Sequence, residues 1–491
     1  MSGPQTPKDE RAPAAPKVGV DEWVAQYERR RAARAGPFAP VVRLWDTTPR
    51  PAWMGGLILL AVLFGIFETN SGDVRVGTNT ILFALLALGL NVVVGWAGLL
   101  DLGYVAFYGF GAYVYAFVAS PKFGVHLATP AAIAVVVAST ALLGLLLGLP
   151  SWRLLGDYLA IVTLFFAQIF LVVVTNGSRI SLPGRGETDL TGGPNGIPGV
   201  DAFGLAGRKA LEPKTYYWIA LGAFVLVAAL LHLLNNSRTG RSWRALREDP
   251  LAAEAMTMPV NRLKLLAFMF GAATAGLTGS IFAAVQIGVF PQNFELFLLI
   301  TIYAMVILGG AGSIGGVVVG AVTIGVTLEI LRDADWGRVL FYVLLLAAAV
   351  VVARSWPVAA GLVAAVIVFG VVVHAIAAAV WPRGVERAPT AAGGPLADLV
   401  DGWVLLPSRP GTIGSVAFVL LVLGVLGLTL VRGWVRVGLA VPLLYLGSFV
   451  WENKLAFQPS VTRFLLVGAV LIFVMNLRPQ GLMGSARVEI V

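Results

Sequence analysis

The segment LGLNVVVGWAGLLDLGYVAFYGFGAYVYA, from Leu88 to Ala116, is a long apolar run that small and polar residues interrupt. It is longer than the roughly 20 apolar residues that a helix needs to cross a bilayer. Asn91, Gly95 and Asp101 break the run. Broken helices at membrane depth are tolerated where they line a cavity or are buried in protein, but small residues also serve close helix packing. Both interpretations stay open from the sequence.

The rest of the chain is also of membrane type. Hydrophobic residues make up 58% of the 491 positions and charged residues 12%, against roughly a quarter charged in soluble domains. We therefore expect an all-α fold, a polytopic transmembrane helical bundle of about 14 spans. The predicted spans lie near residues 53–67, 79–94, 100–118, 130–149, 158–175, 216–234, 265–285, 296–308, 315–330, 339–352, 357–380, 412–431, 437–450 and 462–475.

Charge and rare residues narrow the class further. Residues 1–52 are rich in Pro, Ala and basic residues and contain no apolar signal-peptide core, so we expect a basic cytoplasmic tail. The positive-inside rule then places the N-terminus and the C-terminus in the cytoplasm. There are no cysteines, which excludes disulfides and thiolate metal sites. Because His126, His232 and His374 lie far apart in sequence, no metal site is predicted.

The loop at residues 235–264 carries a cluster of arginines. Its sequence is NNSRTGRSWRALREDPLAAEAMTMPVNRLK, and Pro250 predicts a break between two short helices at 241–249 and 251–258. An ordinary cytosolic loop, whose arginines only hold the topology, is the alternative. Four apolar side chains are candidates for contact with another protein: Trp243, Leu246, Leu251 and Met256.

Residues 237–256, SRTGRSWRALREDPLAAEAM, closely resemble the cytoplasmic coupling loop of permeases from the branched-chain amino-acid ABC importers. Thr257 departs from the pattern, since the family commonly has glycine there. Further motifs resemble those of the same family, in the family's order: Leu88–Ala116, GDYLAIVTL at 156–164, TGGPNGI at 191–197, VILGGAGSIGGVVVGA at 306–321 and LRPQGL at 477–482.

The resemblance implies a transmembrane permease subunit of an ATP-binding-cassette importer, forming half of the pathway for branched-chain or related amino acids. The chain lacks the GxxxxGK[ST] phosphate-binding loop, so no catalytic residue or cofactor is expected in it, and ATP and magnesium would bind a separate ATPase. The implied partners are a second homologous permease subunit, two ATPase subunits, an extracytoplasmic substrate-binding protein and the lipid bilayer of the bacterial inner membrane, with no nucleic acid. The implied ATPase-coupling residues are Arg241, Trp243, Arg244, Ala252, Ala253, Glu254, Ala255 and Met256.

Neutral and small groups are the candidates for the solute pathway. No ionisable residue is expected at mid-membrane with a partner, which argues against an ion-coupled secondary carrier. That carrier, a scaffolding protein and a urea or amide ABC permease remain the alternatives. The candidate pathway residues are Asn91, Gly95, Asp101, Gln168, Thr191 and Asn195.

The family motifs also suggest how the chain is divided. Residues 53–332 would form the permease core, which includes the coupling loop at 235–264. Residues 333–460 depart from the family pattern and are expected to add about four helices. Because four is even, residues 461–491 would return as a final helix and a cytoplasmic C-terminus.

Overall fold

A computed structural model describes most of the chain beyond its N-terminal tail. The chain divides into two compact units, Met1–Leu60 and Ala61–Val491. The predicted tail up to residue 49 and most of the linker after Trp381 lie outside the described residues. The described residues are 50–152, 157–178, 180–182, 186–205, 208–210, 212–332, 334–353, 356–381, 403–405, 410–430 and 434–455, with parts of 465–475 and residues 481–483.

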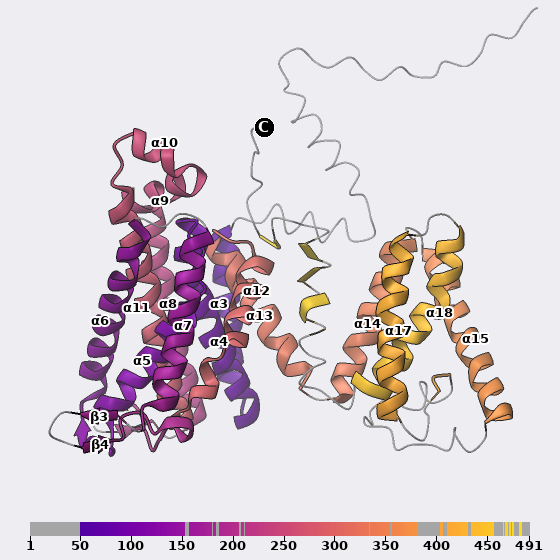
Figure 1. The fold of residues 1–491 in the computed structure, drawn as a ribbon, viewed down its shortest axis with the longest axis horizontal. Coiled ribbons are helices and arrows are strands. Elements are labelled where there is room, and N and C mark those ends of the chain that lie inside the picture. The colour runs from indigo at the N-terminus through magenta and orange to yellow at the C-terminus, as the bar shows by residue number, and fades with distance from the viewer. Residues whose placement is uncertain are drawn as a thin grey trace, which may run out of the picture. The chain divides into compact units, whose positions relative to one another are not determined.

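Helices form the core of the second unit, and α11 (Val260–Gln286) lies at its centre, packed against α4, α5 and α6 (Figure 1). Its length of 27 residues suits a membrane crossing with a further turn on each side. The preceding helices are α3 (Arg50–Phe67), α4 (Ser71–Leu90), α5 (Tyr104–Val118), α6 (Thr129–Gly148), α7 (Asp157–Asn176) and α8 (Pro213–Asn236), and α12 (Leu296–Gly309) and α13 (Ile314–Ile330) follow.

The membrane class of the fold is confirmed. Within the described residues, 7 helices are long and apolar enough to cross a bilayer, and four shorter apolar helices accompany them. The finer prediction of about 14 spans is not established by these helices.

The run from Leu88 to Ala116 is indeed interrupted. After α4 the chain continues as a π-helix, η1 (Asn91–Trp96), and α5 begins only at Tyr104. The helix predicted near residues 100–118 thus begins four residues later than expected. The cause is the turn at Asp101, whose Oδ1 accepts a hydrogen bond of 2.8 Å from the Gly103 N–H, while the Tyr303 hydroxyl donates to its carbonyl at 2.6 Å.

Glycines let the central helices approach closely. A Cβ added to Gly279 of α11 would lie 2.2 Å from the Tyr108 carbonyl oxygen of α5, and one on Gly309 of α12 would lie 2.2 Å from the Gly316 carbonyl oxygen of α13. No real Cβ fits at such distances. Both glycines therefore serve close helix packing.

Short antiparallel strand pairs connect the helices of the core. Figure 1 shows β3 and β4 at the end of the core opposite to α9 and α10. The pairs are β1 (Ala119–Ser120) with β2 (Val125–His126), β3 (Ile180–Leu182) with β4 (Gly186–Thr188), β5 (Ile197–Pro198) with β8 (Gly288–Val289), and β6 (Gly204–Leu205) with β7 (Arg208–Lys209). Three 3-10 turns also occur in the described residues: η2 (Leu149–Trp152), η3 (Gly193–Asn195) and η4 (Pro291–Phe294).

The region predicted to depart from the family contains its own packed helices. Its described elements are α14 (Ala334–Ala353), α15 (Trp356–Val380), α17 (Pro410–Leu430), α18 (Trp434–Val450) and the π-helix η6 (Trp451–Leu455). A buried ion pair joins Arg338 Nη2 of α14 to Glu452 Oε2 of η6 at 2.9 Å. Trp403 and Tyr445 belong to a hydrophobic cluster to which α14, α15 and α18 contribute.

The described residues between 465 and 475 are helical, as predicted for the final span. Val467 and Leu471 from this segment line a small cavity together with Thr323 and Thr327 of α13. Val467 and Leu471 are therefore close to α12 and α13 of the permease core.

Candidate functional site

The loop between α8 and α11 folds into two short helices, α9 (Arg238–Glu248) and α10 (Pro250–Ala255), which project from one end of the core (Figure 1). The Asp249 side chain caps α10, because its Oδ1 accepts hydrogen bonds from the backbone N–H groups of Leu251 at 2.8 Å and Ala252 at 3.0 Å. Pro250 takes the first helical position, which needs no N–H donor. The predicted break at Pro250 is confirmed.

Thr257 follows α10 with a φ of 61°, in the left-handed region. A β-branched residue rarely adopts this conformation, whereas glycine does so without a Cβ clash. The backbone thus accounts for the glycine that the resembling permeases commonly have here. In this chain the same turn is kept, and the Thr257 N–H donates to the Glu254 carbonyl at 2.9 Å.

Two of the four predicted apolar contacts point into the core. Trp243 is 0% exposed, and its indole N–H donates to the Leu263 carbonyl at 2.8 Å. Its ring stacks on that of Trp96, with centroids 6.1 Å apart. Leu246 is buried as well. These residues attach α9 to η1 and α11, so they are not available to another protein.

The exposed part of the loop is its tip. Leu251 is 75% exposed and Met256 is 72% exposed. Around them, Ala252, Glu254 and Ala255 are exposed while Ala253 is buried.

The arginines at 241 and 244 are exposed and turn back to the end of α8. Arg241 Nη1 donates to the Asn236 carbonyl at 2.9 Å, and Arg244 Nη2 donates to the Asn235 carbonyl at 3.2 Å. A helix leaves its last carbonyls without intrahelical partners, and cations near this end are stabilising. Both arginines therefore satisfy carbonyl groups at the C-terminal end of α8.

A third arginine, Arg247, was not singled out from the sequence. Its Nη1 donates to the carbonyl of Gly95 in η1 and, at 3.5 Å, to the carbonyl of Ala311. Ala311 lies in the turn between α12 and α13. No sequence signal separates Arg247 from the other arginines of the loop, because its role depends on two carbonyls that are distant in the chain.

Two side chains of η1 also form hydrogen bonds with the turn between α12 and α13, residues 310–312. We name it the glycine turn. The Gly312 N–H donates to Asn91 Oδ1 at 2.7 Å, and the Trp96 indole N–H donates to the Gly312 carbonyl at 3.1 Å. Gly310 and Gly312 have φ values of 106° and 95°, which a residue with a Cβ rarely adopts.

Residues at the end of the C-terminal motif also bind next to the glycine turn. The N–H groups of Leu482 and Met483 donate to the carbonyls of Leu308 and Gly309, at 2.8 and 3.0 Å. These two carbonyls belong to the last turn of α12, where intrahelical donors are lacking. The coupling loop and the C-terminal segment therefore lie at the same end of the core.

The six candidate pathway residues are not brought together. Asn91 and Gly95 belong to the contacts of the glycine turn, and Asp101 is fully buried in the turn before α5. Gln168 is exposed on α7. The remaining two, Thr191 and Asn195, lie in the loop between α7 and α8, which is built separately from the glycine turn.

The TGGPNGI motif forms an ordered turn in that loop. Thr191 is buried, and its hydroxyl donates to the Val174 carbonyl at 2.6 Å, whereas Asn195 is exposed. After the motif, β5 pairs with β8, so the motif is tied to the segment before α12. Gln292 Nε2 strengthens the link by donating to the Pro194 carbonyl at 3.1 Å.

An ion pair supports the start of this motif. Asp189 Oδ2 lies 2.9 Å from Lys122 Nζ, and Asp189 Oδ1 accepts from the Gly192 N–H at 2.7 Å. Slight burial alone would raise the pKa of Asp189, but the hydrogen bonds and the lysine charge hold that pKa below its ordinary value of 3.8. At neutral pH the carboxylate is therefore charged and holds the loop.

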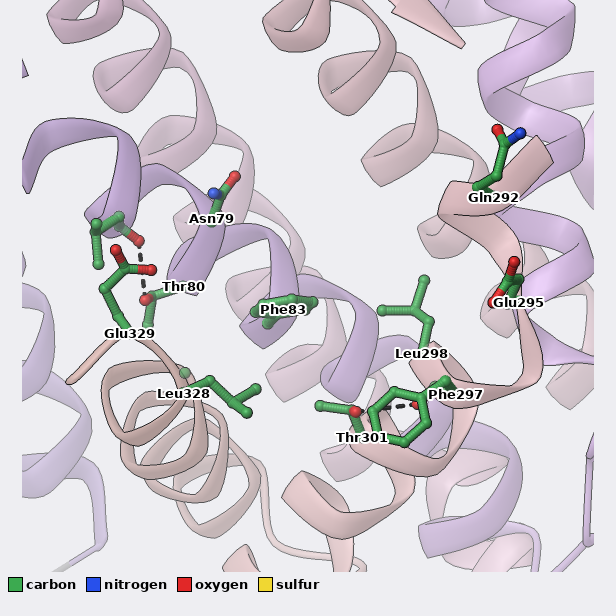
Figure 2. A pocket seen from close by; sticks show the side chains of 12 residues that line it. Asn79, Thr80, Phe83, Gln292, Glu295, Phe297, Leu298, Thr301, Leu328 and Glu329 are labelled. Carbon is green, nitrogen blue, oxygen red and sulfur yellow. Dashed lines mark hydrogen bonds between the residues drawn. The ribbon is translucent and has the colours of Figure 1, made fainter. Parts of the chain in front are cut away.

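A cavity of about 450 Å³ opens between α4, α12 and α13 (Figure 2). Its polar groups come from distant parts of the chain, and none was among the candidate pathway residues. Figure 2 shows Asn79 and Thr80 on α4, Gln292 and Glu295 before α12, and Glu329 on α13. Exposed polar groups are costly against hydrocarbon, which favours an aqueous or protein-facing surface here.

Comparison with known proteins places these features in a family. The family model described as branched-chain amino acid transport system, permease component, matches residues 74–353. The match extends through α14, the first helix of the region 333–460. No solved structure matches the chain.

Individual relatives agree with the family model. The chain is 37% identical to the high-affinity branched-chain amino acid transport system permease protein LivM of Escherichia coli K12 over 311 residues, which are 59% of this chain and 70% of that protein. It is 25% identical to the permease protein BraD of Pseudomonas aeruginosa over 251 residues, 50% of this chain and 80% of that protein. The chain belongs to the family of branched-chain amino acid transport system permease components.

Proposed function

We propose that this permease subunit serves an ATP-driven importer of branched-chain or related amino acids and docks a separate ATPase through the tip of α10. The exposure of Leu251 and Met256 carries the proposal. Both are large apolar side chains on a polar loop beyond the spanning helices, where water offers them no favourable partner. Two exposed apolar side chains on a polar loop are typical of a surface that binds another protein.

Each residue of the loop then has a role. Leu251 and Met256 enter the ATPase surface, and Ala252, Glu254 and Ala255 flank them. Arg241 and Arg244 fix the end of α8, and Trp243 anchors α9 on the core. Buried Ala253 packs beneath the tip and does not face the partner.

In this proposal, ATP and magnesium bind the ATPase subunits and the chain itself does no covalent chemistry. The coupling loop and the C-terminus are cytoplasmic. Their shared position at one end of the core supports that orientation. A substrate-binding protein delivers the solute at the opposite end.

A second homologous permease would complete the pathway along the cavity between α4, α12 and α13. The carboxylates of Glu295 and Glu329 and the amides of Asn79 and Gln292 offer hydrogen-bond acceptors to the ammonium group of an amino acid. We favour these groups as pathway residues over the six candidates predicted from the sequence.

The test changes Leu251 and Met256 at the tip and leaves Arg241, Trp243 and Arg244 unchanged. In Leu251→Glu/Met256→Glu the chain is expected to insert normally but to lose co-purification of the ATPase and ATP-driven leucine uptake in proteoliposomes. The matched control for ATPase binding is Val125→Glu/Leu127→Glu, two similarly apolar, partly exposed residues of another loop, which should retain co-purification of the ATPase. Unchanged ATPase binding and uptake in the tip variant would refute the proposal. Uptake of urea instead of leucine would assign the urea alternative.

A further inference from the structure

Arg247 and Trp243 lie four residues apart on α9 and therefore on one face of that helix. Both side chains point from α9 to η1. Trp243 stacks on Trp96, and Arg247 donates a hydrogen bond to the Gly95 carbonyl. Arg247 additionally donates to the carbonyl of Ala311. It is thus the link from α9 to two segments at once.

The surrounding backbone leaves room for this arginine. A Cβ on Gly98 would lie 2.9 Å from Arg247 Cγ, and a Cβ on Gly312 would lie 2.6 Å from Arg247 Nη1. Both glycines have positive φ values, 70° and 95°. A hydrogen bond from a guanidinium to a carbonyl is charge-assisted and stronger than one between neutral groups. The Gly95 carbonyl is therefore the main acceptor of Arg247, and the Ala311 carbonyl, at 3.5 Å, is the longer contact.

The segments that Arg247 contacts belong to the helices around the cavity. The segment η1 continues α4, and the glycine turn joins α12 to α13. The cavity of Figure 2 is lined by the opposite ends of the same helices, with Asn79 on α4, Thr301 on α12 and Glu329 on α13. A helix transmits displacement along its axis because its backbone hydrogen bonds keep it stiff.

We propose that Arg247 is the positioning residue through which movement of the coupling loop reaches the helices that line the cavity, a role that rests on the proposed function. When the ATPase displaces α10, α9 moves with it. Arg247 draws the Gly95 and Ala311 carbonyls along, and the hydrogen bonds of Asn91 and Trp96 to Gly312 keep η1 and the glycine turn together.

The first test measures coupling in the complete transporter reconstituted in proteoliposomes. For Arg247→Met we expect the ATPase to bind normally, while leucine transported per ATP hydrolysed falls by about tenfold. Arg247→Lys should restore part of the ratio, because an ammonium keeps the charge without the planar fork. Arg238→Met, an exposed arginine of the same helix, is the matched control.

The outcomes separate the two proposals. A purely structural role would lower the amount of folded transporter, and with it uptake and hydrolysis in proportion, leaving the ratio unchanged; that result would overturn the role of Arg247. Failure of the unaltered chain to bind an ATPase would instead refute the proposed function.

A second measurement does not depend on the folding of any Arg247 variant. The chain has no cysteine, so spin labels on Glu248→Cys and Ala311→Cys report only α9 and the glycine turn. With Arg247 present, we expect the distance between the labels to stay the same with and without bound ATP, because the two elements move together. A change of several Å, of the size of a helix shift, would contradict the inference.

Discussion

Asn91 and Gly312, 221 positions apart in the chain, are joined by a hydrogen bond of 2.7 Å from the Gly312 N–H to Asn91 Oδ1. Asn91 is fully buried. The bond satisfies a backbone donor in a turn that has no regular secondary structure. It also ties the π-helix after α4 to the connection between α12 and α13.

Replacing Asn91 with alanine should therefore leave the partly buried Gly312 N–H without its acceptor. We expect a loss of about 1 to 3 kcal/mol in the free energy of unfolding, measured by thermal unfolding in detergent. Asn79→Ala, on the exposed face of the same helix, should leave the unfolding temperature nearly unchanged. Equal stability of the two variants would show that the buried bond contributes nothing.

Substitutions at glycine distinguish close packing from flexibility. Gly279→Ala should be strongly destabilising, by roughly 1 to 3 kcal/mol as for overpacked cores, because its Cβ would lie 2.2 Å from the Tyr108 carbonyl oxygen. At Gly222 of α8 no atom lies within 4 Å of an added Cβ, so Gly222→Ala should be neutral or stabilising by up to about 1 kcal/mol. Unfolding temperatures in detergent compare the two. Similar effects at both positions would contradict the packing argument.

The outcome for the coupling loop shows what a sequence can predict. Pro250 predicted the helix break correctly, since proline acts on its own local backbone. The roles of the arginines at 241, 244 and 247 could not be predicted, because they differ only in which distant carbonyls each side chain reaches. Likewise Trp243 and Met256 are both apolar, and only the packing of α9 on η1 buries one and leaves the other exposed.

The residues that we propose for the pathway were harder to predict. Asn79, Gln292 and Glu329 lie on separate elements, and the cavity that they share is created by the packing of α4, α12 and α13. Hydropathy locates the helices but not the faces that turn toward one another. The candidates Asn91 and Gly95 were predicted to interrupt a helix, but they lie in the π-helix that continues α4, and the structure places them at the glycine turn.

The buried ion pair between Arg338 and Glu452 offers a test of the region beyond α13. Arg338→Met should cost about 3 to 5 kcal/mol in unfolding free energy, because it leaves the Glu452 carboxylate buried without that partner. The double variant Arg338→Met/Glu452→Leu should be closer to the unaltered protein. Thermal unfolding in detergent measures both, and a double variant as unstable as the single one would argue against the ion pair as the cause.

The same ion pair also distinguishes two possible start points for the added region, residue 333 and residue 354. Deleting residues 333–460 removes Arg338 and Glu452 together, whereas deleting 354–460, from the end of the family match, keeps Arg338 and removes the carboxylate of its ion pair. We expect more folded protein from the first deletion. Because deleting 333–460 would remove four spans, an even number, a C-terminal reporter in that variant should stay cytoplasmic, and a periplasmic reporter would refute the count of four.

The last prediction concerns the TGGPNGI turn, in which Thr191 and Asn195 have opposite environments. Thr191 is buried, donates to the Val174 carbonyl and accepts from the Gly193 N–H at 3.3 Å. Thr191→Val keeps the shape but removes the hydroxyl, so it should loosen the turn and lower the unfolding temperature. Asn195 is exposed, so Asn195→Ala should leave stability unchanged.

Uptake then decides whether the turn touches the solute or its receptor. In proteoliposomes containing the complete transporter and the binding protein, a contact role predicts slower uptake for Asn195→Ala with normal assembly and basal ATP hydrolysis. A purely structural turn predicts that only Thr191→Val is impaired. Unchanged uptake by Asn195→Ala at several receptor concentrations would remove Asn195 from the pathway, because direct contact is the route by which an exposed side chain would affect transport.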